Sequence, residues 1–468
     1  MEDFQYEDAI SRFEKMLQDK TRIYFDLDEY VDIIGQYLDN GDLEFAETAL
    51  NIAEETYPDA DDLLLKRAEY LLEFSEYAKS KAIINQLEAI YADDFEYMML
   101  KARYYSKTNQ PQNALAEYSK ALNFAVEIDY ILHCMGMEYM AMQDFENALE
   151  CFLRALECDV NDDIAMISCT LCYEELDRID EGIIFLKKHL EKLPYSEEAW
   201  IQLGLLHSLN KDFSAAYDAY YFAHCCNAKS IVALTNLANS CESLGDYNKA
   251  ISHYEEILEL DDSPAYTWLR IGKCYMKMDN TSRALSAYQK AMKEYPELDQ
   301  VWYEISLVHE KLCNYDEALY FMKRAFDIDS MNVKYCKQLA HLHIHYGKFE
   351  EAEENYEKLI KLQPNKVNNW IAYAELLMML GEYQKAIDLL EKAYKKFSRV
   401  ELLYQLSACY YLKREDVCGD NTLEKARELN EKMFSAMLKK YPVLKKGVSS
   451  VFVSKLKSNG LEGTAEKI

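Results

Sequence analysis

Small residues return every 34 positions along most of this chain, and this period limits what the chain can fold into. One column of alanine and glycine runs without a break through nine positions: Ala114, Ala148, Gly182, Ala216, Ala250, Ala284, Ala318, Ala352 and Ala386. A second column keeps the same phase: Ala102, Gly136, Thr170, Gly204, Ala238, Gly272, Ser306, Ala340 and Ala374. Small side chains let packed helices approach closely. The period predicts a stack of 34-residue helix pairs, each buried against its neighbours.

The residues around these columns follow helical spacing. Ala114, Tyr118 and Ala121 stand at i, i+4 and i+7, which is one stripe of an α-helix. All four tryptophans share one position, four residues before the second column: Trp200, Trp268, Trp302 and Trp370. Left-handed caps are expected to end first helices at Gly41, Gly245, Gly347 and Gly381. Prolines are expected just after second helices at Pro58, Pro194, Pro296 and Pro364.

These residues carry a family resemblance. The pattern stands as Trp200-Leu203-Gly204-His207 and as Trp268-Ile271-Gly272-Tyr275, and the second run continues through Ala284, Tyr288, Ala291 and Pro296. This resembles the tetratricopeptide repeat. The resemblance implies an all-α, right-handed superhelical solenoid of antiparallel helix pairs with about twelve repeats. It also implies a protein that binds other proteins.

The repeat sets the expected boundaries. Residues 1–26 are predicted to hold an N-terminal capping helix, 27–399 eleven repeats, 400–442 a degenerate repeat with a capping helix, and 443–468 a basic flexible tail. In the second repeat, Ala82 and Ala89 come two places late, which predicts a longer turn between its helices. In the twelfth, the polar run from Lys413 to Thr422 is expected to be a long connection.

Composition narrows the function. The net charge of −30 opposes nucleic-acid binding, which needs a basic surface. No apolar run is long enough to span a membrane, and the acidic start of the sequence is unlike a signal peptide, so we expect a cytoplasmic protein. Cys169 and Cys172 fall inside a predicted helix, where they are expected to be buried rather than redox-active.

The resemblance also implies which side chains line the concave groove. An acidic zone comes first: Asp28, Asp32, Asp39, Asp62, Glu69 and Glu73. An apolar zone follows: Met137, Met140, Ile164, Ile167, Leu171, Ile201, Leu205 and Leu209. A basic and polar zone comes last: Asn236, Asn239, Arg270, Lys273, Lys277, Lys334, Lys337, His341 and His345.

The apolar zone and the basic zone each have two interpretations. The apolar side chains either pack against the next repeat or form a slot for an amphipathic helix or apolar peptide. The lysines are either balanced by nearby glutamates such as Glu304 and Glu310, or they capture an acidic peptide or a C-terminal carboxylate. The clamp for peptide C-termini known in the family is not reproduced, because Thr235 and Tyr266 stand where it needs lysines.

No catalytic residue, cofactor or metal site is predicted. His341 and His345 share a helix face, but a third ligand would have to come from another repeat, and His343 is expected in the core. We therefore expect a non-catalytic scaffold or adaptor that binds a peptide or helix of a protein partner in its groove. The alternative is a regulatory or cargo-sensing module of a secretion, envelope or signalling system. The tail, with Val451-Phe452-Val453 between lysines, offers a route to self-association.

Overall fold

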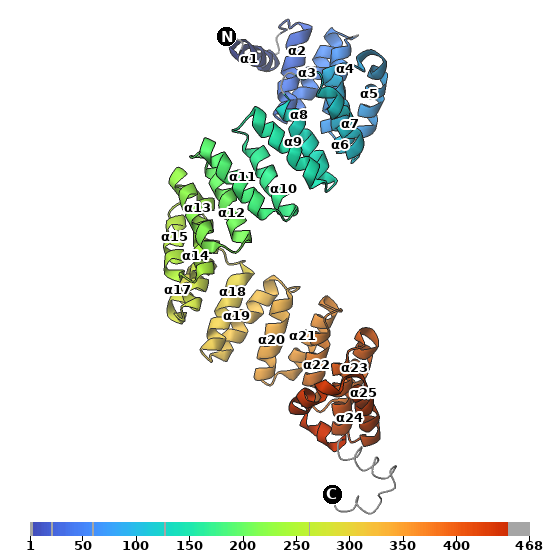
Figure 1. The fold of residues 1–468 in the computed structure, drawn as a ribbon, viewed down its shortest axis with the longest axis vertical. Helices are drawn as coiled ribbons and strands as arrows, with labels where there is room; N and C mark the ends of the chain where they lie inside the picture. Colours follow the sequence, from blue (N-terminus) through green and yellow to red (C-terminus); the bar gives the residue numbers. More distant parts are fainter. Residues whose placement is uncertain (1–2, 20–21, 59, 126–127, 262, 448–468) are drawn as a thin grey trace, which may run out of the picture. The chain divides into compact units, whose positions relative to one another are not determined.

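The computed structural model describes residues 3–19, 22–58, 60–125, 128–261 and 263–447, with side chains from residue 9 onward. The chain divides into two compact units, Met1–Leu244 (unit 1) and Gly245–Ile468 (unit 2), which are taken one at a time. Every regular element within the described ranges is helical (Figure 1).

Unit 1 contains the helices α1 (Asp3–Asp19), α2 (Leu27–Asp39), α3 (Leu43–Thr56), α4 (Asp61–Glu73), α5 (Tyr77–Tyr91), α6 (Phe95–Lys107), α7 (Pro111–Ala121), α8 (Asp129–Ala141), α9 (Phe145–Cys158), α10 (Asp163–Glu175), α11 (Ile179–Lys192), α12 (Glu197–Leu209), α13 (Phe213–Cys226) and α14 (Ile231–Leu244).

Unit 2 contains α15 (Tyr247–Leu258), α16 (Ala265–Lys277), α17 (Thr281–Glu294), α18 (Asp299–Lys311), α19 (Tyr315–Ile328), α20 (Val333–His345), α21 (Phe349–Leu362), α22 (Val367–Met379), α23 (Tyr383–Phe397), α24 (Val400–Leu412), α25 (Asp416–Lys440) and the 3₁₀ turn η1 (Pro442–Leu444).

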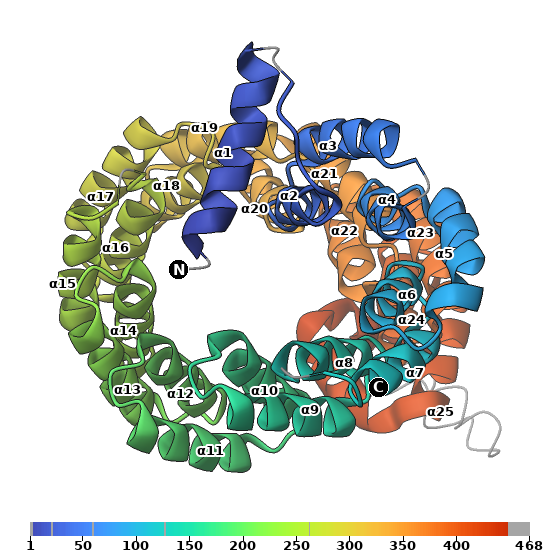
Figure 2. The ribbon, with the colours of Figure 1, turned by 90° about the horizontal axis from the view of Figure 1, so that it is seen from above.

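Successive helices pack in pairs: in the described residues, unit 1 holds six such pairs from α2 to α13, and unit 2 holds five from α16 to α25. The prediction of an all-α stack of helix pairs is confirmed. Within each unit the first, even-numbered helices lie along the inner side and the second, odd-numbered helices along the outer side (Figure 2). We call the side formed by even-numbered helices the inner face of that unit.

The turn inside each pair fixes the register. A residue with positive φ recurs every 34 positions, at Gly41, Ser75, Asn109, Gln143, Asp177, Lys211, Gly245, Asp279, Cys313, Gly347 and Gly381. The four glycines expected in left-handed caps all adopt that conformation. The next residue then donates its N–H to a carbonyl in the preceding helix, as Asp42 does to Tyr37 O (2.8 Å). One turn geometry therefore serves every repeat, including those without glycine.

The small columns allow the close helix contact that the sequence predicts. A Cβ atom on Gly204 would lie 2.5 Å from Tyr220 Cε1, and one on Gly272 would lie 2.3 Å from Tyr288 Cε1. Tyr220 and Tyr288 are the large residues four places after the small one on the partner helix, and both are buried. In both pairs the tyrosine ring thus fills the space that a side chain at the glycine would occupy.

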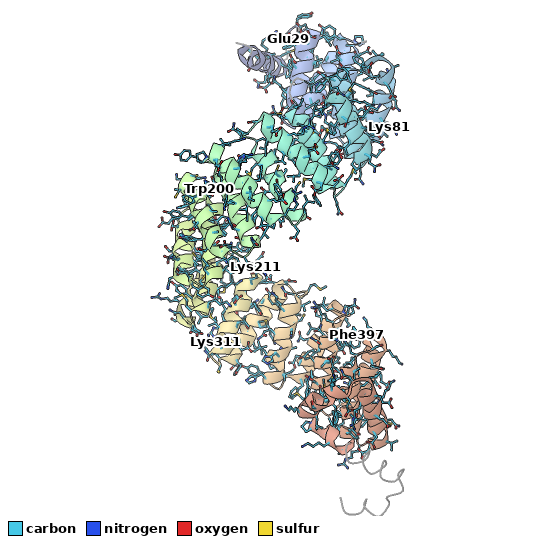
Figure 3. The ribbon with its side chains drawn as sticks, in the orientation of Figure 1. Glu29, Lys81, Trp200, Lys211, Lys311 and Phe397 are labelled. Atoms are coloured by element: carbon cyan, nitrogen blue, oxygen red, sulfur yellow. The ribbon has the colours of Figure 1, made fainter. Side chains whose placement is uncertain are left out.

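The tryptophans stand at one structural position, half-buried on first helices. Trp200, near the start of α12 (Figure 3), donates its indole N–H to Pro194 O (2.9 Å), and Trp302 donates to Pro296 O (2.7 Å). In these two repeats the tryptophan links its helix to the proline of the preceding connection. Cys169 and Cys172 are fully buried in α10, as expected of structural cysteines.

The second repeat corrects one prediction. Its helices are joined by three residues, like those of other repeats, and not by a longer turn. Ala82 and Ala89 are exposed, while Ser80, Ile84 and Leu87 are buried at the i, i+4, i+7 stripe. Ser80 replaces the alanine of the column because its hydroxyl donates to Ala68 O (2.8 Å) across the helix contact.

The twelfth repeat corrects another. The long connection predicted from Lys413 to Thr422 is helical from Asp416 onward. The left-handed residue Arg414 comes one place early, so the stripe shifts to Gly419, Leu423 and Ala426, all buried. Non-helical dihedral angles at Asn430 (φ −160°, ψ 83°) then bend α25. The part after Asn430 is a separate helical segment, which the sequence did not reveal.

Both ends of the stack are covered. Ala9, Phe13 and Met16 of α1 are buried against Tyr30, Ile33 and other residues of the first repeat. At the other end, Leu444 is fully buried against the twelfth repeat, so the folded chain continues past the predicted boundary at 443. Residues 448–468, which hold the rest of the predicted tail, lie outside the described residues.

Candidate partner-binding surface

An apolar strip lies on the inner face of unit 1. It consists of six predicted groove residues whose side chains remain 37–63% exposed: Met137, Ile164, Ile167, Leu171, Leu205 and Leu209. Met140 is half-buried beside them, whereas Ile201 keeps only 8% of its surface exposed. Ile201 is therefore buried, whereas the other six side chains are accessible.

The strip arises because α8, α10 and α12 are apolar on more than one face. Their opposite sides carry core residues such as Leu132, Cys169 and Leu206, which are fully buried. Met137, Leu171 and Leu205 occupy the same position in three successive repeats, 34 residues apart, and we call them the row. Their helices α8, α10 and α12 follow one another along the inner face (Figure 2). Contiguous exposed apolar surface of this kind is typical of a protein-interaction site.

Charge on these three helices is of one sign. They carry seven carboxylates and neither lysine nor arginine: Asp129, Glu138, Asp163, Glu174, Glu175, Glu197 and Glu198. Glu138 is buried, and the other six are exposed or half-buried near the helix ends. Glu197 and Glu198 accept hydrogen bonds from the amides of Asn227 and Gln202 (both 2.8 Å), which leaves their charge in place.

A cavity of about 830 Å³ adjoins the strip at the start of α12. Three of the seven carboxylates line it, from Asp163, Glu197 and Glu198, together with one cation, Lys192. Its apolar wall includes Ile201 and Val232. The cavity therefore combines an apolar wall with an excess of negative charge.

The predicted basic and polar zone is divided between the units. Asn236 and Asn239 lie half-buried on α14 of unit 1. Arg270, Lys273 and Lys277 lie on α16 of unit 2, and four further residues lie exposed on α20: Lys334, Lys337, His341 and His345.

In unit 2, neighbouring side chains pair with several of the cations of this zone. Lys273 Nζ lies 3.6 Å from Glu304 Oε1, and His341 Nδ1 lies 3.4 Å from Glu310 Oε1. Burial raises the pKa of Glu304 above its ordinary value against the opposing pull of Lys273. Arg270 Nε donates to Tyr254 Oη (2.9 Å). These contacts favour the interpretation in which glutamates of α18 balance the cations beside them.

Unit 1 holds a half-buried ion cluster that the sequence did not predict. Glu69 of α4, assigned only to an acidic zone, binds both Lys66 Nζ (3.1 Å) and Arg103 of α6. Burial would raise the pKa of Glu69, but Arg103 and Lys66 outweigh it and hold that pKa below its ordinary value. Glu69 and Arg103 stand 34 residues apart, at the same position of adjacent repeats. This spacing is the sequence signal from which their pairing could have been predicted.

The histidines do not assemble into a metal centre. No group of three or more His, Cys, Asp or Glu side chains is placed to hold an ion within the described part of the chain. His343 is buried, as predicted, with Nδ1 3.2 Å from Asn355 Nδ2. His345 packs on the Tyr315 ring instead, with ring centroids 3.9 Å apart.

Comparison with known proteins gives four matches to one family description. Family profiles of the tetratricopeptide repeat match residues 131–159, 231–264, 266–297 and 343–408. Together with the recurring helix pairs, these matches show that the chain contains tetratricopeptide repeats.

Three relatives illustrate the range of proteins to which the chain is similar. The general transcriptional corepressor ssn6 of Schizosaccharomyces pombe is 29% identical over 39% of this chain and 14% of its own length. The BBSome complex member BBS4 of Bos taurus is 23% identical over 60% of this chain and 54% of its own. The TPR repeat-containing protein YpiA of Bacillus subtilis is 21% identical over 82% of this chain and 89% of its own. The chain thus spans only about a seventh to a half of the first two.

The search for membrane-spanning segments gave a negative result. Among the described residues, no helix combines the length and the apolar character needed to cross a bilayer.

Proposed function

We propose that this protein is a non-catalytic scaffold or adaptor that binds a peptide or helix of a partner on the inner face of unit 1. The observation that carries the proposal is the exposed row of Met137, Leu171 and Leu205 on three successive first helices. Leaving such side chains in water costs free energy that a partner would recover on binding. The relative BBS4 is named as a member of the BBSome complex, which supports a binding role for this chain.

The test compares two variants of the full chain. Leu171→Glu with Leu205→Glu places charge in the row, and both sites are exposed enough to accept it without disturbing the core. Ile184→Glu is the matched control, since Ile184 is 66% exposed on the outer helix α11. Quantitative mass spectrometry of proteins co-purified from native lysate should show partners lost from the double variant and retained by the control. Equal recovery with both variants would contradict the proposal.

A further inference from the structure

The apolar strip and the carboxylates beside it together specify the chemistry of a ligand. Apolar surface alone would accept many partners, but α8, α10 and α12 surround it with negative charge and offer no cation of their own. We propose that the inner face of unit 1 selects a basic amphipathic α-helix. This inference rests on the proposed function and names the class of partner that the same surface takes.

The geometry of the row favours a helix over an extended peptide. The row has one exposed apolar residue, which we call a rung, in each repeat. The helices α10 and α12 pack directly against each other. Packed helices lie about 8–10 Å apart. Two turns of an α-helix advance about 10.8 Å and return to the same face. Apolar residues at i and i+7 of a partner helix would therefore meet Leu171 and Leu205, and one a further seven residues along would lie toward α8, which carries Met137. In a strand, same-face residues are only about 6.6 Å apart, which does not match the rungs.

The carboxylates flank the row on both sides. Asp163 and Glu198 stand at the starts of their helices, while Glu174 and Glu175 stand in the last turn of α10. The carboxylates at the helix ends gain nothing from the helix dipole, which is negative there, so that edge attracts cations most strongly. Lysine or arginine side chains that flank the apolar stripe of a partner helix would reach both edges.

The cavity beside α12 supplies a place for one long basic side chain. Its apolar wall would hold the aliphatic stem and its carboxylates Glu197 and Glu198 the charged end. Anionic ligands such as nucleic acids and acidic membrane surfaces are disfavoured here, because the seven carboxylates repel phosphate.

The experiment must separate this selectivity from the attraction of any basic peptide to a chain of net charge −30. Three synthetic peptides of about 18 residues, long enough for three rungs, serve as probes. The first is an amphipathic helix with leucine on one face and lysine on the other. The second replaces lysine by glutamate. The third scrambles the first, so that charge and composition are kept and the apolar face is lost. Binding to the full chain is followed by fluorescence anisotropy at about 0.15 M salt, where long-range attraction is screened.

We expect the lysine helix to bind at least about tenfold more tightly than either of the other peptides. Leu171→Glu with Leu205→Glu should weaken that binding about tenfold or more through loss of the row. Glu175→Lys with Glu198→Lys should reduce the preference for lysine over glutamate. Glu150→Lys with Glu157→Lys, which makes the same change of net charge on the outer helix α9, should not.

Several results would overturn the inference. One is equal affinity for the lysine and glutamate helices, and another is equal affinity for the scrambled peptide. A third is an equal response to the charge reversals on the inner and outer helices, which would mean that net charge alone is sensed. A fourth is self-association that Leu171→Glu with Leu205→Glu abolishes in sedimentation, because the occupant would then be a second copy. The proposed function survives the first three if native partners are still lost from the leucine variant.

Discussion

In unit 1, α8, α10 and α12 present exposed apolar side chains and carry carboxylates but neither lysine nor arginine. In unit 2, α16 and α20 carry lysine, arginine and histidine with no carboxylate of their own, and α18 between them supplies Glu304 and Glu310 as partners. The fold of the repeat is the same in both, since Gly204 and Gly272 face equivalent tyrosines. The contrast shows that the core positions set the architecture while the inner-face positions vary. In unit 1 the inner-face positions carry carboxylates without lysine or arginine and leave apolar side chains exposed. In unit 2 much of the positive charge at these positions is paired with glutamates of α18.

The largest expected effect on stability concerns the helix packing that both units share. Gly204→Leu in unit 1 and Gly272→Leu in unit 2 each force a side chain into the ring of the facing tyrosine. Each should lower the free energy of unfolding by about 3 kcal/mol, the upper end of the range for overpacking. Urea denaturation followed by circular dichroism measures this. A loss in one unit and none in the other would show that the two cores are not equivalent.

A smaller effect is expected for the ion cluster of unit 1. Glu69→Gln removes the partner of Arg103 and should cost about 2 kcal/mol at pH 7, less than a fully buried pair because Arg103 keeps 31% of its side-chain surface exposed. The pKa of Glu69 is lowered by folding, so its stabilisation is present above the ordinary glutamate value of about 4.3 and is lost as pH falls through the folded value. Thermal unfolding of wild type and variant should therefore converge in acid. A gap independent of pH would contradict the assignment.

Glu304 in unit 2 should behave in the opposite way. Its pKa is raised by burial, so folding disfavours the charged form, and this cost is present above the folded pKa and relieved as pH falls toward the ordinary value. Glu304→Gln should raise the free energy of unfolding at pH 7 by less than about 1 kcal/mol. The gain should shrink as the pH is lowered in the same unfolding series. A destabilised variant at pH 7 would mean that the contact with Lys273 outweighs burial.

The smallest effect concerns the exposed lysines of α20. Lys334→Glu with Lys337→Glu should change the free energy of unfolding by less than about 0.5 kcal/mol, because exposed charges contribute little to stability. It should also leave binding of the basic helix unchanged. A marked loss of that binding would move the ligand surface from unit 1 to unit 2.

The sequence predicted the fold well because the determinants of each helix pair are local. The columns of small residues, the left-handed glycines and the prolines after Thr56, Lys192, Glu294 and Leu362 all act within one repeat. The two errors, in the second and the twelfth repeats, have different causes. In one, another residue type replaced the alanine of the column, and in the other the repeat period changed. Ser80 replaced alanine through a hydrogen bond to Ala68 O, and the twelfth repeat lost one residue before Arg414.

The candidate surface was less predictable because exposure depends on contacts between repeats. Ile201 and Leu205 stand on one helix at predicted groove positions, yet one is buried and the other exposed. The pairing of Glu69 with Arg103 likewise joins helices 34 residues apart. A repeat pattern locates such positions but does not reveal which neighbour covers them.

The most direct test of the account is site-specific photocrosslinking in the native cell. A photoreactive residue is placed in turn at Leu171 on the inner face of unit 1, at His341 on the inner face of unit 2 and at Ile184 on an outer helix. We expect a discrete crosslinked partner from position 171, and none of the same mass from 341 or 184. Crosslinks to that partner from 184 or 341 but not from 171 would contradict it.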